Sequence, residues 1–463
     1  TGDARSGTAV GTDALGRTVA FGQIFDPSTT RTVNGQNVRD PFPGNTIPQS
    51  RWNPVSRNIL QLAPITDPIN NNLLNNMVSL GACCPVFDEK MYTVKGDHLI
   101  NDKHRMSISF NHNDRVRNNS PGGRWGAPPN SPTGVYQLQQ TPGFIGRFSE
   151  DWTVTPSILN HFAVGYNRFG NINESVFVDQ GWPEKIGLRN TAQTTFPALV
   201  FAGQPILGGG IGAGGRLGSE SRGLSYNGSW IVQDDLTWIR RKHNFKMGFE
   251  WRAYYYNFRG KSGTGTFNFN PIQTQQPGFA TQTGHAFASF LLGAVESTSR
   301  AITVANPGYR LNYPAFYFSD DWKVSQKLTL NLGVRWEIIG PYSEWAGRMT
   351  NIDPGKANDA AGGRLGALVF ADDLGVKSFQ KTNWRQISPR IGFAYAFSPK
   401  FVLRGGYGVN NIAPTANFNT PSTFGYNGSI AVNSANTALQ FAQDPVMYLD
   451  QPYRDFGGAL PNK

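Results

Sequence analysis

The sequence has no apolar stretch long enough to cross a bilayer as an α-helix. Such a helix needs about 20 consecutive, mostly apolar residues, and the longest candidate, AFASFLLGAV, runs only from Ala286 to Val295. The chain also lacks an initiator Met and a charged-then-apolar leader. A membrane protein built of helices is therefore excluded, and we expect the N-terminus to be either mature or cut out of a longer protein.

Cysteine and histidine, two residue types that often hold metals, are scarce. The only cysteines are the neighbours Cys83 and Cys84, which cannot join distant segments. We expect a loop pair there and leave open its oxidation to a vicinal disulfide. The six histidines show no metal-ligand spacing, and no metal or other cofactor is expected.

Motifs of covalent or nucleotide chemistry are missing as well. The chain has neither a G-x-S-x-G elbow nor a G-x-x-x-x-G-K-[ST] loop. GGGIGAGG, Gly208 to Gly215, contains a G-x-G-x-x-G match, but loop-like residues follow it, so we interpret it as a flexible loop. Three pairs of adjacent acids cannot act as catalytic couples, because neighbouring strand residues point to opposite faces: Glu150-Asp151, Asp234-Asp235 and Asp320-Asp321. We predict that the protein is not an enzyme.

Charged residues are few, at 16% of the chain against about 25% in an ordinary soluble protein. Lys and Arg outnumber Asp and Glu by 42 to 31, but they are scattered along the chain, which argues against a nucleic-acid partner. Glycine, with 53 residues, and aromatic side chains, at 13%, are plentiful. This composition is typical of a β-rich protein with many turns.

One pattern is repeated along the chain: a strand, a short turn and a returning strand. It is clearest from Leu328 to Ile338, where Leu, Val, Trp and Ile alternate with Thr, Asn, Gly, Arg and Glu. Period-two alternation predicts a β-strand with one apolar and one polar face. We expect five such hairpins, hence about ten strands, at 91–113, 142–170, 229–258, 316–339 and 389–410.

Strand and loop lengths indicate what surrounds the apolar face. Alternation holds for about ten residues, or roughly 34 Å of strand, which tilted by about 45° spans the ~25 Å apolar band of an outer membrane. Short turns on one side and long loops on the other are typical of bacterial outer-membrane barrels. The long polar segments between hairpins lie at about 114–142, 170–228, 259–312 and 341–388. The open alternative is a large soluble β-sandwich or propeller, whose apolar face would be a dry core.

A barrel would place two sets of side chains in functional positions. Six polar-face residues are lumen candidates, either in contact with a ligand or plug or forming a mutually satisfied wall: Lys246, Glu250, Arg252, Arg335, Glu337 and Arg404. Five tryptophans suit the aromatic girdles of a membrane interface: Trp152, Trp238, Trp251, Trp322 and Trp336. Glu150, Asp234 and Asp320 share a face with bulky residues. We expect these acids at the membrane rim, where an acid costs roughly 0 to 1 kcal/mol, or re-aimed by a bulge.

Several motifs resemble those of one family. YFSDDWKVSQKLTLNLGVRWE (Tyr317 to Glu337) is similar to the recurrent hairpin of TonB-dependent outer-membrane receptors of the Oar-like group, abundant in acidobacteria, although here Trp follows the second acid directly. SPRIGFAYAF, VLRGGYGV, HAFASFLLG, FDPSTTR and DPFPGNTIPQSRWNPVSRNIL also resemble family segments. The similarity runs through most of the 463 residues.

The resemblance implies a barrel of roughly 22 strands, an N-terminal plug, and import driven by the TonB-ExbB-ExbD complex. No plug-like region or TonB box is found in the sequence. We therefore interpret the chain as an internal barrel fragment, with about ten to twelve strands. Residues 1–90 and 411–463 would be extracellular loop regions, and residues 91–410 the hairpins.

The expected fold class is all-β, an antiparallel transmembrane β-barrel segment with long extracellular loops. The expected function is uptake of a large, unidentified ligand by a receptor embedded in outer-membrane lipid. The alternative is a secreted or surface-anchored β-rich protein or adhesin that binds carbohydrate or protein. The two differ in whether the apolar faces meet lipid or a dry core.

Overall fold

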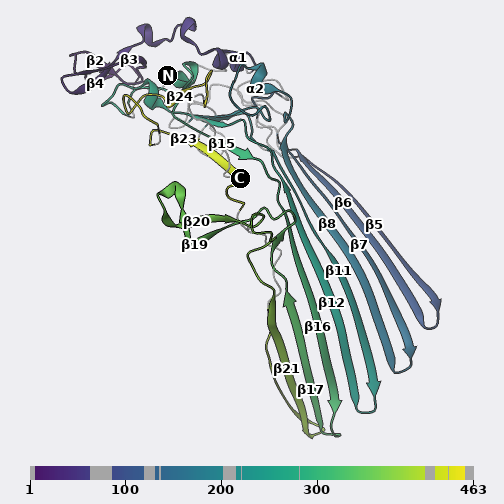
Figure 1. The fold of residues 1–463 in the computed structure, drawn as a ribbon. Coiled ribbons are helices and arrows are strands. Elements are labelled where there is room, and N and C mark those ends of the chain that lie inside the picture. The colour runs from purple at the N-terminus through teal and green to yellow at the C-terminus, as the bar shows by residue number, and fades with distance from the viewer. Residues whose placement is uncertain are drawn as a thin grey trace.

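The structure, a computed structural model, describes residues 6–62, 86–118, 131–134, 137–201, 215–220, 222–280, 282–411, 423–435 and 437–453. Cys83, Cys84 and most of the glycine run at 208–215 lie outside the described residues. Figure 1 shows two parts: a large sheet of long strands and, at one end of these strands, a group of short strands and helices. We call the second part the cap; it contains the described residues of 6–62, 176–220, 260–307 and 423–453.

The large sheet is antiparallel and contains eleven strands. All five expected hairpins are present, which confirms the all-β fold class. Across the sheet the order is β22-β21-β17-β16-β12-β11-β8-β7-β6-β5, with β18 on the side of β16. The bounds are β5 (Val86–Asn101), β6 (His104–Asn118), β7 (Gln137–Thr155), β8 (Ile158–Ser175), β11 (Arg222–Arg240), β12 (His243–Arg259), β16 (Gly308–Lys323), β17 (Leu328–Ile339), β18 (Ser343–Glu344), β21 (Asn383–Ser398) and β22 (Phe401–Gly408).

Most of these strands are longer than the expected ten or so residues. β7 and β11 have 19 residues each, and β8 has 18. The expected length was wrong because period-two alternation marks only the amphipathic part of a strand. The backbone ladder continues beyond it toward the cap, through sequences such as RGLSYNGS at the start of β11, which consists mostly of glycine and polar residues.

The register sorts side chains onto an apolar face and a polar face. On β12, Phe245, Met247 and Phe249 share the apolar face, which β16 continues with the opposing Asp320, Phe318 and Phe316. No second layer of described residues covers this face: the exposed fraction is 64% for Val94 and 42% for Val334. Large apolar side chains exposed over a whole sheet mark a surface that meets lipid or a partner.

The cap is built from short elements that come from distant parts of the chain. Its largest sheet has five strands in the order β10-β9-β13-β15-β23. The cap elements are β1 (Ala9–Thr12), β2 (Thr18–Ala20), β3 (Phe25–Val33), β4 (Gln36–Pro41), η1 (Pro43–Asn45), η2 (Gln49–Arg51), α1 (Pro54–Leu62), α2 (Trp182–Lys185), β9 (Ala198–Phe201), β10 (Gly215–Leu217), β13 (Thr266–Phe269), η3 (Pro271–Thr274), α3 (Ala286–Leu291), β14 (Ala294–Val295), β15 (Ser297–Thr303), β23 (Asn427–Val432) and β24 (Met447–Tyr448). Among the described residues, no helix is long and apolar enough to cross a membrane.

A separate hairpin projects beside the cap (Figure 1). It consists of β19 (Thr350–Asn358) and β20 (Arg364–Phe370), joined through the 3-10 turn η4 (Asp359–Ala361). Its Ile352 and Leu365 are 64% and 73% exposed. The hairpin therefore presents apolar side chains to its surroundings.

The cap has its own hydrophobic core. Phe201, Phe269 and Phe290 are at most 1% exposed, and Phe290 meets the other two rings edge-on, with centroids 5.5 and 5.4 Å apart. Such edge-to-face contacts stabilise a core beyond its buried area. Residues from two of the segments expected as long loops, 170–228 and 259–312, thus pack with residues of 6–62 and 423–453 around a common core.

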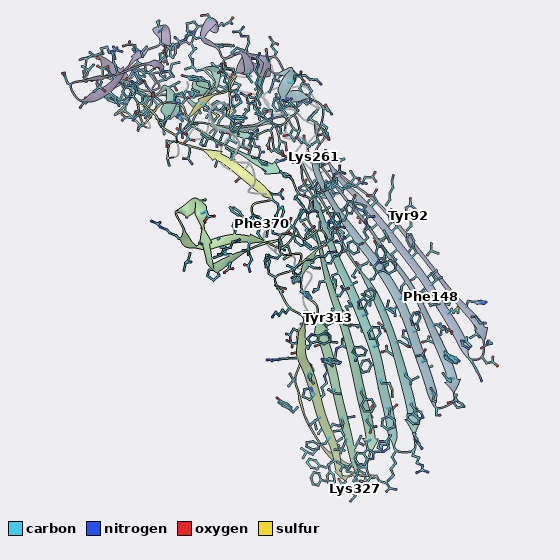
Figure 2. All side chains as sticks on the ribbon, in the orientation of Figure 1. Tyr92, Phe148, Lys261, Tyr313, Lys327 and Phe370 are labelled. Carbon is cyan, nitrogen blue, oxygen red and sulfur yellow. The ribbon has the colours of Figure 1, made fainter. Side chains whose placement is uncertain are left out.

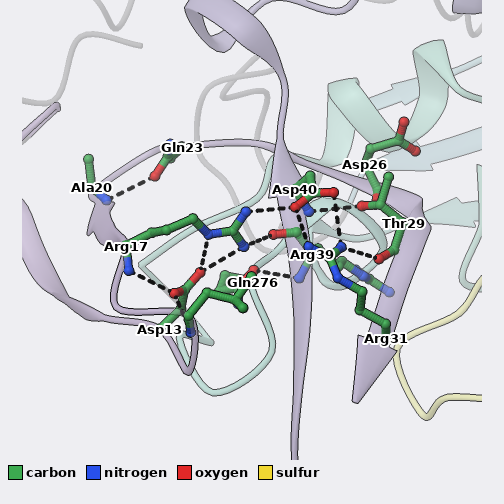
Figure 3. A network of polar contacts seen from close by, with 11 residues as sticks. Asp13, Arg17, Ala20, Gln23, Asp26, Thr29, Arg31, Arg39, Asp40 and Gln276 are labelled. Carbon is green, nitrogen blue, oxygen red and sulfur yellow. Dashed lines mark hydrogen bonds and ion pairs between the residues drawn. The ribbon is translucent and has the colours of Figure 1, made fainter. Parts of the chain in front are cut away.

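Arg39, on β4, ties three parts of the cap together. Its side chain is fully buried, and its guanidinium donates to the carbonyls of Gln273 at 3.0 Å and Gln443 at 3.0 Å. Burial lowers the pKa of Arg39 to about 10, so the group stays charged at neutral pH. Figure 3 shows the surface side of this network, where Arg17 and Arg31 both bind Asp40.

Removing the buried guanidinium should destabilise the cap. We predict that R39M lowers the free energy of unfolding of the cap by about 3 to 5 kcal/mol, because several buried carbonyls lose their donor. Hydrogen exchange of residues 271–276 measures the loss. The control is R31M, which removes an exposed ion pair with Asp40 and should leave this exchange almost unchanged. Equal effects of both variants would contradict the assigned role of Arg39.

His285 makes the cap sensitive to acid. Its Nδ1 accepts the N–H of Phe287 at 3.1 Å and thereby caps α3. Burial lowers the pKa of His285 to about 4, from an ordinary 6.5. The folded state therefore holds the neutral ring, and the unfolded state gains a proton first as the pH falls.

We predict that the cap is stable above about pH 6.5 and loses up to about 3 kcal/mol between pH 6.5 and pH 4. Hydrogen exchange of residues 285–295, corrected for intrinsic rates, follows this loss. H285N keeps an N-cap acceptor but cannot titrate, so its exchange should depend much less on pH. An unchanged pH profile in H285N would rule out His285 as the titrating group.

Candidate functional site

Four charged residues meet on the polar face in the middle of the large sheet. Arg335 on β17 donates to Glu337 at 3.0 Å and reaches Glu250 on β12 at 3.4 Å. Arg252 donates to Glu250 at 3.1 Å, and the hydroxyl of Tyr313 donates to Glu337. We call these five residues the polar cluster. Its two acids and two arginines balance, so the cluster carries no net charge.

A small residue allows the polar cluster to form across three strands. Glu250 on β12 and Glu337 on β17 both lie opposite Ala315 of the intervening strand β16. The short Ala315 side chain leaves space above β16, through which Arg335 extends to Glu250. Figure 2 shows Tyr313 of the cluster between the cap and the strand tips.

The remaining lumen candidates lie on the same polar face but outside the polar cluster. Lys246 is 4.0 Å from Asp321, and both side chains are about half exposed. Arg404 on β22 lies opposite Ala394 and is exposed. The structure thus brings together Glu250, Arg252, Arg335 and Glu337, while Lys246 and Arg404 stay apart. Contact of any of them with a ligand or plug stays a prediction.

The first acid of each pair contacts the preceding strand on the apolar face. Nδ1 of His104 is 2.7 Å from Glu150, and Nδ1 of His243 is 2.7 Å from Asp320. Asn160 donates to Asp234 at 2.5 Å. The two histidine rings also stack on the tryptophans that lie two residues after the acids, with centroids 5.4 and 5.3 Å apart. These acids are therefore held by hydrogen bonds.

The second acid of each pair contacts a later strand on the polar face. Asp151 accepts from His161 at 2.6 Å, and Asp321 accepts from Asn331 at 2.6 Å. Asp235 accepts from Tyr317, two strands away, at 2.7 Å. This last contact passes over Gly248, where an added Cβ would lie 2.3 Å from Asp235 Oδ1. The two acids of a pair point to opposite faces, as predicted, and together they connect three strands.

Sequence reasoning missed the partners of these acids. His104 and His243 each begin a strand directly after a tight turn, and their partners Glu150 and Asp320 each lie two residues before a Trp. This recurrence could have suggested the pairing. It could not give the register, because 46 and 77 residues separate the partners.

The five girdle candidates all lie on the apolar face, at two heights. Trp152, Trp238 and Trp322 lie within three residues of the turn end of their strands, whereas Trp251 and Trp336 lie eight residues into β12 and β17. Trp336 donates its ring N–H to the carbonyl of Trp384 at 2.9 Å. A role in membrane girdles stays a prediction for all five.

The all-β fold agrees with the family comparison. The chain belongs to the family described as an outer membrane beta barrel domain, which matches residues 1–462. The protein therefore resides in the outer membrane.

Two solved structures are similar to the chain. One is the outer membrane transporter YddB from Escherichia coli, at a TM-score of 0.33 and 9% identity, covering 69% of this chain and 39% of YddB. The other is the toluene transporter TodX from Pseudomonas putida, at a TM-score of 0.22 and 10% identity, covering 78% of this chain and 74% of TodX. The chain thus spans about two fifths of the length of YddB. No curated protein matches it in sequence.

The residues of the polar cluster should be energetically coupled to one another. The more exposed pair Lys246 and Asp321 should be coupled only weakly or not at all. In a double-mutant cycle of E250Q and R335Q we predict a coupling energy of about 1 to 2 kcal/mol, because both partners are mostly shielded from water. The cycle of K246Q and D321N should give about 0.5 kcal/mol or less. Urea unfolding in lipid bilayers measures both. Equal coupling energies in the two cycles would contradict the interpretation that the charged side chains of the polar cluster neutralise one another.

Proposed function

We propose that this protein is a TonB-dependent receptor of the Oar-like group that takes up a large ligand across the outer membrane. The observation that carries the proposal is the hairpin Tyr317 to Glu337, whose motif resembles that family and whose strands have one lipid-compatible face and one polar face. The family resemblance is also the reason for proposing TonB-ExbB-ExbD as the energising partner.

The two parts of the molecule suit the two steps of uptake. The cap lies at the strand ends opposite the tight turns (Figure 1), the side that faces the exterior in bacterial barrels. We propose that the cap captures the ligand. The self-neutralised polar cluster then offers a lumen wall without strong net charge, past which a ligand or an internal plug can move. Binding and gating require no covalent step from this chain and no cofactor.

A second candidate function is adhesion by an outer-membrane protein. The projecting β19-β20 hairpin favours it, because Ile352 and Leu365 are exposed at a distance from the core. Such a surface suits contact with a protein or glycan that is held outside the cell rather than imported. The two functions predict different phenotypes for a strain that lacks the gene.

Uptake and adhesion can be separated in one set of strains. We predict that deletion of the gene abolishes cell accumulation of at least one compound from a labelled panel of glycans, peptides, siderophores and cobalamins. A protonophore should abolish the same accumulation in the parent strain, since TonB-dependent import needs the proton gradient. Unchanged accumulation of every compound, together with lost attachment to surfaces, would overturn the proposal in favour of adhesion.

A further inference from the structure

Two neighbouring tight turns bring five basic side chains together with no acid between them. The turn after β11 contributes Arg240, Arg241 and Lys242, and the turn after β16 contributes Lys323 and Lys327. We call these five residues the basic turn pair. The N–H of Lys323 donates to the carbonyl of Lys242 at 2.8 Å, so the turns are adjacent. Figure 2 places Lys327 at the strand tips, far from the cap.

The positive charge of the basic turn pair is not neutralised by the described part of the chain. All five side chains are exposed, and none forms an ion pair with a described residue. Lys242 donates only to the carbonyl of Val324, at 3.3 Å. The nearest acids along β16, Asp320 and Asp321, are already engaged by His243 and Asn331. Five positive charges therefore remain available to an anionic partner.

Turn geometry does not explain the choice of residues. Arg241 has φ 57°, in the left-handed region that Gly and Asn adopt far more readily than Arg does. An arginine at this position adds strain to the turn. Compared with Gly or Asn, Arg brings a positive charge on a long side chain to this position.

The neighbouring aromatic side chains indicate the depth of this charge in the membrane. Trp238 and Trp322 lie on the apolar face, two residues before Arg240 and one before Lys323. The Arg240 guanidinium lies over the Trp238 ring, 5.3 Å from its centroid. Tryptophan is enriched at the level of lipid headgroups, so the predicted girdle role of Trp238 and Trp322 would place the basic turn pair at the level of the lipid phosphates.

We propose that the basic turn pair binds the phosphate groups of anionic glycerophospholipids in the leaflet that the tight turns face. Basic clusters next to a membrane attract anionic lipid with a contribution from each charge. Arginine also donates two parallel hydrogen bonds to a phosphate. The bound lipid would hold the two hairpins at a fixed height in the bilayer.

The test compares two charge-matched triple variants of the full-length protein, purified in mild detergent and titrated with fluorescent phosphatidylglycerol. R241N/K323Q/K327Q removes three charges from the basic turn pair, and Asn suits the left-handed backbone at position 241. The control K356Q/K377Q/K381Q removes three exposed charges from the segments near β19 and β20. Heat-modifiable migration in gels checks that both variants are folded.

We expect the turn variant to bind phosphatidylglycerol at least about fivefold more weakly than the parent, and the control variant to bind it unchanged. Phosphatidylcholine should bind weakly to all three proteins. Unchanged phosphatidylglycerol binding in the folded turn variant would overturn the proposal. It would equally be overturned if phosphatidylcholine bound as tightly, if lipopolysaccharide were preferred, or if inorganic phosphate displaced the lipid.

Discussion

The antiparallel hydrogen-bond ladder between neighbouring strands is the constraint on which the rest of the structure depends. Hydrocarbon offers no partner to backbone N–H and C=O groups, so a membrane wall must satisfy them between strands. The β11-β12 ladder does so over the whole of β12 and all but the first two residues of β11, from Leu224 opposite Arg259 to Arg240 opposite His243. The same pleat separates an apolar face from a polar face. In a bilayer the outer edges of β5 and β22 need strand partners as well.

Charged residues occupy distinct positions along the strands of the large sheet. Exposed basic residues lie at the tight turns, and the acids next to them are held by His, Asn and Tyr side chains of other strands. Farther along the strands, the polar cluster balances Glu250 and Glu337 against two arginines. Each charge of the polar cluster thus has a partner of opposite sign on another strand or on its own. The unbalanced charge remains at the rim, where lipid phosphate can neutralise it.

The sequence allowed the sheet to be predicted much better than the cap. Strict alternation, as in Leu328 to Ile338, reveals a two-faced strand from local information alone, and the five hairpins follow from it. The polar cluster was predicted as a set of residues but not as a contact, since its formation depends on register across β16. The cap core could not be predicted, because residues such as Phe201 and Phe290 come from segments too short to show a period. Likewise, Arg39 binds the carbonyl of Gln273, 234 residues away, and nothing local marks that pairing.

The central claim is that the alternating faces of the large sheet meet lipid and lumen. Single cysteines at Leu332 and Val334 on the apolar face, and at Asn331 and Gly333 on the polar face, test it most directly in intact outer membranes. A water-soluble maleimide should label positions 331 and 333 and leave 332 and 334 unlabelled, although Leu332 and Val334 are 37% and 42% exposed in the protein alone. If positions 332 and 334 are labelled as fast as 331 and 333, the apolar face meets water and the account is wrong.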